Sequence, residues 1–202
     1  MRLYKLTDAY GYTRGGTKWG PGITHAAASN PGKPLTARSL CTRRVIHAYT
    51  SPLLAVLMNP VHADFIAPKL WIADGIGEAI SDGLKVGVKK LTIIREIPLP
   101  DVTDEHCMRF AILCAKRVTH SREWKKWADN WLSGRNHEIE SAKEAKAWID
   151  FLSAENFALE AALSTHPSPR AARAAEAASS FARLYGKKIN FERLARIACK
   201  GD

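Results

Sequence analysis

The chain has 202 residues, of which 46% are hydrophobic and 25% charged, and its net charge at pH 7 is +10. This composition is typical of a globular protein and excludes a largely disordered chain. The longest apolar run, residues 51–58, is well below the ~18 residues that a membrane-spanning helix needs. No apolar segment of the signal-peptide kind follows the N-terminus. We therefore expect no membrane partner and a cytoplasmic location.

The positive charge is concentrated at the start of the chain. Residues 1–50 contain eight Lys or Arg and one acid, Asp8, whereas residues 51–100 contain five basic and five acidic residues. Residues 101–202 contain 17 basic and 14 acidic residues. This asymmetry predicts an anionic partner, most commonly nucleic acid or a ribonucleoprotein. The alternative is a basic surface that serves solubility alone.

The first half of the chain has the pattern of a mixed α/β domain. Residues 8–40 contain six Gly and three Pro without any period, which predicts a long loop with at most one short strand. Ser51-Pro52 has the chemistry of a helix start, and Pro60 is expected to end that helix. Alternating or β-branched residues predict strands over 2–7, 44–49, 70–73, 86–88 and 91–97.

The second half has helical periodicity throughout. Its many alanines favour closely packed helices. The expected helices are 103–117, 121–134, 142–152 (ending there or continuing with a kink to 163), 168–186 and a last one capped by Asn190. We therefore predict an α+β protein, with a mixed α/β N-terminal domain over residues 1–100 and an all-helical C-terminal bundle over residues 101–202.

Trp124, Trp127 and Trp131 lie on one face of the second expected helix. Such a stripe is more often part of a core than a platform for stacked bases. The four cysteines include no close pair, so we expect buried, reduced thiols. The histidines lack neighbouring ligands at metal-site spacing, and we predict no metal.

The segment Arg14-Gly15-Gly16-Thr17-Lys18-Trp19-Gly20-Pro21-Gly22 combines cations, an aromatic residue and flexible glycines. It matches neither of the common glycine-rich nucleotide-binding motifs. Cations beside an aromatic side chain suit phosphate contact combined with stacking, whereas the alternative is a solvated loop. The residues expected to bind nucleic acid or a partner are Arg14, Lys18, Trp19, Arg38, Arg43 and Arg44.

Several longer segments resemble an uncharacterised family of phage and prophage proteins. They are residues 17–19, 40–41, 46–52, 54–57, 59–60, 82–87, 91–92 and 95–100. Residues 109–115 and 131–134 and the alanine-rich helices are similar to a helical tail described as a putative immunity protein domain. The resemblance implies a mobile-element origin and action inside a host bacterial cell. It also implies a non-enzymatic protein that inhibits a host defence ribonucleoprotein of the CRISPR type.

A second resemblance is to the ADP-ribosyltransferase fold. Residues 4–7 on a first strand, followed by residues 48–52 leading into a helix, have the order of parts found in those enzymes. Lys5 stands where that pattern has His or Arg. This resemblance implies NAD as cofactor and Tyr4, Tyr49 and Glu96 as catalytic residues. We favour a binding protein without a cofactor and keep the transferase as the alternative.

Overall fold

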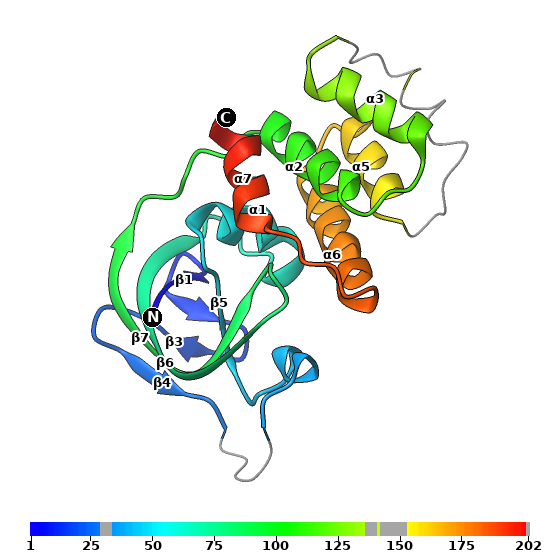
Figure 1. The fold of residues 1–202 in the computed structure, drawn as a ribbon. Coiled ribbons are helices and arrows are strands. Elements are labelled where there is room, and N and C mark those ends of the chain that lie inside the picture. The colour runs from blue at the N-terminus through cyan, green and yellow to red at the C-terminus, as the bar shows by residue number, and fades with distance from the viewer. Residues whose placement is uncertain (29–33, 136–140, 142–152, 201–202) are drawn as a thin grey trace. The chain divides into compact units, whose positions relative to one another are not determined.

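A computed structural model of the chain describes residues 1–28, 34–135, 141 and 153–200 (Figure 1). The chain divides into two compact units, Met1–Asp101 and Val102–Asp202. Among the described residues, every strand belongs to the first unit and the second contains helices without strands, so the protein is α+β as predicted. The division falls one residue after the boundary expected from the sequence. Within the described ranges, no helix combines the length and the apolar character that crossing a bilayer requires.

The first unit is built on an antiparallel sheet with the strand order β1-β6-β7-β4, in which β5 also pairs with β7. A separate pair is formed by β2 and β3. The strands are β1 (Arg2–Thr7), β2 (Tyr12–Thr13), β3 (Thr17–Lys18), β4 (Thr24–Ala26), β5 (Ile46–Ala48), β6 (Lys69–Ser81) and β7 (Val86–Ile97), and the helices are the 3-10 helix η1 (Ala37–Cys41) and α1 (Pro52–His62).

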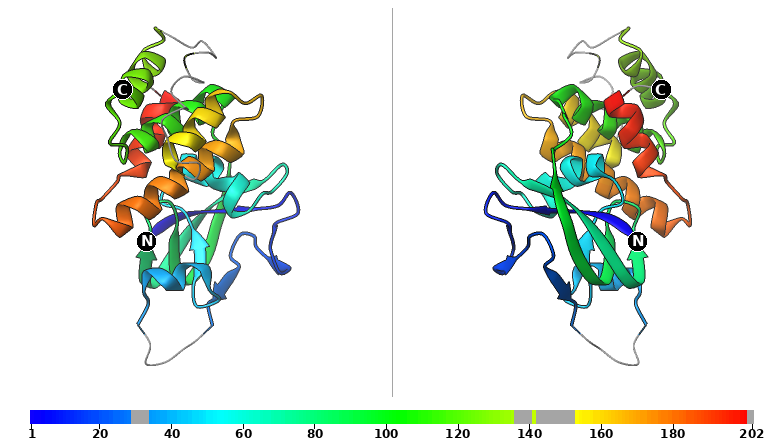
Figure 2. Two further views of the ribbon diagram at one scale, coloured as in Figure 1. Left: turned by 90° about the vertical axis from the view of Figure 1, so that its right-hand side faces the viewer. Right: turned by 90° about the vertical axis from the view of Figure 1, so that its left-hand side faces the viewer.

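The long hairpin of β6 and β7 curves around the interior of this unit (Figures 1 and 2). Its register shifts between Ile72 and Ala73 and again between Ile76 and Ala79, and such irregularities bend a strand. Just after β5, Tyr49 exchanges two backbone hydrogen bonds of 2.8 Å with Tyr4 of β1. The chain after β5 is thereby attached to the opposite edge of the sheet, and the strands surround the core.

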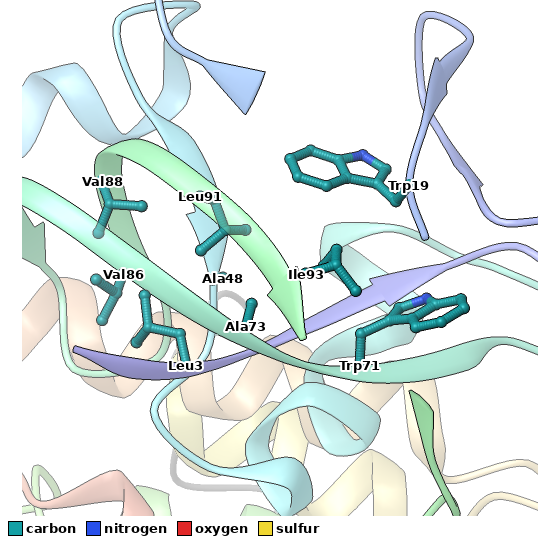
Figure 3. Close-up of a cluster of buried hydrophobic side chains, with 9 residues drawn as sticks. All are labelled: Leu3, Trp19, Ala48, Trp71, Ala73, Val86, Val88, Leu91 and Ile93. Atoms are coloured by element: carbon teal, nitrogen blue, oxygen red, sulfur yellow. The ribbon is translucent and has the colours of Figure 1, made fainter. Parts of the chain in front are cut away.

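Side chains from four strands fill this core, and Trp19 joins them from the loop after β3 (Figure 3). Trp19 is only 3% exposed. Its indole Nε1 donates a 3.0 Å hydrogen bond to Thr13 Oγ1. Trp19 is therefore a core residue and does not offer the exposed stacking surface that the sequence suggested. The cluster consists of Leu3, Trp19, Ala48, Trp71, Ala73, Val86, Val88, Leu91 and Ile93.

The segment expected to be an irregular loop contains three short strands instead of at most one. Asp8 Oδ1 accepts hydrogen bonds from the backbone N–H groups of Tyr10 and Tyr12 and so closes the turn after β1. Gly11 follows with φ +84°, and its carbonyl accepts from Trp19 N at 2.7 Å. A Cβ at Gly11 would lie 2.9 Å from Trp19 O, so a side chain there is excluded sterically.

Helix α1 continues past Pro60 to His62, two residues beyond its predicted end. The proline removes one N–H donor, but Ala63 N still donates to Asn59 O at 2.9 Å. Two strands predicted separately, 86–88 and 91–97, form the single strand β7. β7 continues through Lys89 and Lys90, which separate those apolar segments, because β6 pairs with β7 on both sides of them.

The second unit consists of helices whose starts agree with the caps read from the sequence. The hydroxyl groups of Thr103 and Ser121 and the Asn190 amide oxygen each accept from a backbone N–H three residues ahead. Ser153 caps a further helix in the same way. The helix expected over 142–152 lies outside the described residues. The described helices are α2 (Asp104–Lys116), α3 (Arg122–Leu132), α5 (Ala154–Ala162), α6 (Ser168–Leu184) and α7 (Phe191–Lys200).

The bundle buries the tryptophan stripe of α3 and the alanine face of α6. Trp124, Trp127 and Trp131 are at most 6% exposed, which confirms them as core. Helix α6 packs against α2 and α5 through buried alanines, whose small side chains allow a close approach. The thiols of Cys107 and Cys114 are free and buried. Burial raises the pKa of Cys107 to about 12 and that of Cys114 well above its usual value, so both are neutral thiols.

Candidate functional site

Two adjoining cavities in the first unit contain most of its chemically notable side chains. The inner cavity, of about 340 Å³, lies between β1, the end of α1 and the β6–β7 turn. The outer cavity, of about 730 Å³, is more open and extends towards β4 and the segment before β5. Lys5, Thr13, Arg14 and His47 line both, so the two cavities form one continuous depression.

Lys5 is the central cation of this depression. Alternation along β1 places Leu3, Lys5 and Thr7 on the side of the strand that faces the core. The Lys5 ammonium donates a 2.6 Å hydrogen bond to His47 O and lies 5.2 Å from the centre of a Trp19 ring. Lys5 is half-buried, and burial lowers the pKa of its ammonium to about 8.

His47 on β5 is neutral at physiological pH. Its Nε2 is hydrogen-bonded to Leu40 O, and because a carbonyl only accepts, Nε2 carries the proton. The pKa of His47 is lowered to about 4, mainly by burial and to a smaller extent by the positive charges of Lys5 and Lys85. Within the depression, Lys5 thus supplies the charge and His47 supplies a neutral ring and a backbone acceptor.

Aromatic side chains also line the inner cavity. The rings of Tyr49 and His62 are stacked, with centroids 5.9 Å apart and planes 19° from parallel. The Tyr49 hydroxyl lies 3.3 Å from His62 Nδ1. Asn59 holds Phe65 beside them, because its side chain donates to Phe65 O at 3.0 Å and accepts from Phe65 N at 3.1 Å. The continuation of α1 past Pro60 is what brings His62 to this cavity.

Two further cations, Arg14 and Lys85, stand at the inner cavity. Arg14 Nη2 donates to Ala63 O at 3.2 Å, which ties the β2–β3 turn to the end of α1. The Asp82 carboxylate accepts from the backbone N–H groups of Leu84 and Lys85 and fixes the turn that presents Lys85. Among the described residues, no carboxylate lines either cavity, so the depression is a concentration of positive charge.

Of the cations expected to contact a partner, Arg14 and Arg43 both line the outer cavity, although 29 positions separate them in the sequence. Lys18 faces away: it pairs with Tyr12 across the β2–β3 ribbon, and its ammonium lies 4.4 Å from the Tyr12 ring centre. Arg38 is exposed on η1 and lines neither cavity. Arg44 donates to Ser39 Oγ and Pro34 O and thereby supports the loop before β5.

The structure brings together only two of the three residues of the transferase alternative, because Tyr4 and Tyr49 are backbone partners whereas Glu96 lies apart from them. Tyr49 lines the inner cavity, but Tyr4 and Glu96 do not. Tyr4 lies on the face of β1 opposite Lys5. Glu96 is on β7, two strands away from β1, and its carboxylate lies 3.7 Å from Lys69 Nζ. No metal-binding cluster of His, Cys, Asp or Glu is found in the part of the chain that the structure describes.

Sequence reasoning did not select Lys5, Lys85 or His62 as binding residues. One local signal was present: Lys5 is a charged residue at a core-facing position of an alternating strand, between Leu3 and Thr7. The site is assembled by strand pairing between distant segments, and such pairing produces no recognisable pattern in the local sequence. When the chain was compared with protein-family models, with curated proteins and with solved structures, nothing matched, and its function has to be argued from this site.

Proposed function

We propose that the first unit binds single-stranded nucleic acid in the outer cavity and acts as a binding protein without catalysis. The observation that carries this proposal is the convergence of Arg14 and Arg43 with Lys5 on one open cavity that no described carboxylate lines. Several cations without acidic neighbours match the evenly spaced charges of a phosphate backbone. A cavity of about 730 Å³ has the size of a small-molecule site and suits individual nucleotides, not a duplex.

The same surface suits the exposed RNA of a ribonucleoprotein. A phage protein that inhibits a host defence complex, the role that the family resemblance implies, would use these cations to hold the RNA of its target. The phosphate chemistry is the same for a free strand and for a strand presented by such a complex.

A salt titration tests the proposal. Each phosphate contact to a single strand contributes a slope of roughly −0.7 in log affinity against log salt concentration. The three cations of the outer cavity predict a slope of about −2 at pH 7 for a 12-nucleotide single strand. The double variant Arg14→Ala, Arg43→Ala should flatten the slope to about −0.7.

Arg95→Ala is the matched control. Arg95 is an exposed arginine of the same unit that lines neither cavity, and its variant removes one positive charge from elsewhere on the surface, against two in the double variant. We expect its slope to equal that of the unmodified protein. A loss in Arg95→Ala half as large as that in the double variant would show that only net charge matters. Salt-independent binding, or none to DNA, RNA or a ribonucleoprotein, contradicts the proposal.

A further inference from the structure

The inner cavity differs from the outer one in how it is enclosed and lined. It has about half the volume, is less open, and is bordered by the end of α1 and by the β6–β7 turn. Three cations, Lys5, Arg14 and Lys85, reach it from three separate elements. The stacked rings of Tyr49 and His62 line it as well. A pocket lined by cations and by aromatic rings has the two features that bind a nucleotide, one for phosphate and one for the base or sugar.

Lys5 points to a bound anion. Its ammonium is partly buried, and no carboxylate among the described residues forms an ion pair with it. A desolvated cation is unfavourable unless an opposite charge compensates it. The His47 carbonyl and the Trp19 ring compensate only in part, because neither carries a full negative charge. An anionic group in the inner cavity would supply the missing charge.

We propose that the inner cavity binds the terminal phosphate of a single-stranded nucleic acid, with the terminal nucleotide against Tyr49 and His62. This inference rests on the proposed function, because the rest of the strand would lie in the outer cavity. A terminal phosphomonoester carries a charge of about −1.5 to −2 at pH 7, whereas an internal phosphodiester carries a single charge. Three converging cations therefore favour the end of a strand over its interior.

The arrangement of the two cavities also sets the direction in which a bound strand would leave the inner cavity. Lys5, Thr13, Arg14 and His47 are shared by both cavities, so a strand whose terminal phosphate sits in the inner cavity continues past them into the outer cavity. Arg43 lines only the outer cavity and would contact a following phosphate. Lys85 lines only the inner cavity and would contact the terminal one. Variants of these two residues therefore allow the binding of the strand and the recognition of its end to be tested separately.

The experiment compares 12-nucleotide strands, in DNA and in RNA, that carry a 5′-phosphate, a 3′-phosphate or hydroxyl groups at both ends. A 13-nucleotide strand with hydroxyl ends controls for added charge. Charge-assisted hydrogen bonds predict about ten- to a hundredfold tighter binding of one phosphorylated end, measured by fluorescence anisotropy at pH 7. Lys85→Met should reduce this preference, because only Lys5 and Arg14 then remain at the terminal phosphate. Arg43→Ala should weaken the binding of all strands alike, and Arg95→Ala should change neither property.

The outcomes distinguish this inference from the proposed function. If phosphorylated and hydroxyl-ended strands bind equally well, end recognition is wrong while strand binding stands. If no strand binds, the proposed function itself is wrong. If Lys85→Met keeps the full preference for a phosphorylated end and remains folded by circular dichroism, the end is recognised elsewhere and the inner cavity is not the site.

Discussion

The Lys5 ammonium donates a 2.6 Å hydrogen bond to the backbone carbonyl of His47, and both residues line the inner and the outer cavity. Their side chains have pKa values of about 8 and about 4, one above and one below neutrality. At pH 7 the pair therefore presents one positive charge and one neutral ring to the depression. Both pKa values are lowered by burial, which makes each group a source of pH-dependent stability.

Lys5→Met should remove a rise in stability at alkaline pH. The pKa of Lys5 is about 8 in the folded protein against 10.5 for an ordinary lysine. Between these values the unfolded chain holds the proton more strongly, so the free energy of unfolding rises with pH. We expect the unmodified protein to gain about 1–2 kcal/mol relative to Lys5→Met between pH 7.5 and 9.5, measured by urea unfolding. Parallel pH profiles for the two proteins would contradict the burial of this ammonium.

His47→Gln should remove a loss of stability at acidic pH. The pKa of His47 is about 4 when folded against 6.5 when unfolded. As pH falls from 6.5 towards 4, the unfolded chain takes up a proton that the folded protein does not, and the folded state loses stability. With allowance for partial solvent screening, the unmodified protein should lose about 1 kcal/mol more than His47→Gln between pH 7 and pH 5.

The glutamine in this variant keeps an N–H donor for Leu40 O, so the comparison isolates the titration of the ring. The measurement is urea unfolding of both proteins at the two pH values. An equal loss in both would mean that His47 titrates in the folded protein much as it does in the unfolded chain.

The strength of nucleic-acid binding should fall above pH 8, because Lys5 then loses the charge that faces the bound phosphate. An anion near the ammonium raises its pKa, so affinity should drop by about tenfold per pH unit above 8 until the pKa of the complex is reached. Lys5→Met should bind more weakly at pH 7 and lack this dependence. Anisotropy titrations from pH 7 to 9.5 measure it. The titratable or charged groups around Lys5 are Arg14, His25, His47, Tyr49, His62, Asp82 and Lys85.

Trp127→Ala should destabilise the helical unit strongly. The Trp127 side chain is 6% exposed, and its ring lies 5.6 Å from that of Trp124. Truncating a buried tryptophan removes its packing and leaves a cavity, at a cost of about 3–5 kcal/mol in the free energy of unfolding. Lys126→Ala, on the exposed side of the same helix, is the control and should stay within about 0.5 kcal/mol. An unchanged melting temperature in Trp127→Ala together with lost partner binding would instead make the stripe a binding platform.

Incubation with NAD should give neither hydrolysis nor ADP-ribosyl transfer. A transferase of this kind would need its acid beside Tyr49, and Glu96 is paired with Lys69 away from the inner cavity. Mass spectrometry of the protein and of a host lysate supplied with NAD tests this expectation. NAD hydrolysis that disappears in Glu96→Gln would establish the transferase alternative.

Local chemistry in the sequence determined the helical unit. The caps at Thr103, Ser121 and Asn190 and the 3.6-residue period of Trp124, Trp127 and Trp131 depend on residues within a few positions of one another. For the same reason, the alternation in β1 and the apolar segments of β7 were sufficient to predict strands. The sequence also singled out Arg14 and Arg43, together with Lys18, Arg38 and Arg44, because counting charges needs no structure.

Tertiary structure alone decided which of these residues meet. Trp19 follows a run of glycines and cations and looks exposed in the sequence, but the curvature of β6 and β7 creates the core that it fills. β2, β3 and β4 form because their backbone groups find partners, β4 on β7 and β2 and β3 on each other, and neither partner is visible as a local pattern. Lys5 and Lys85 lie 80 positions apart and share a cavity only because β6 pairs with β1 and with β7, and β7 pairs with β5. Long-range strand pairing is set by the packing of the whole unit. The sequence therefore showed which segment carries the positive charge, whereas only the fold showed which cations line one cavity.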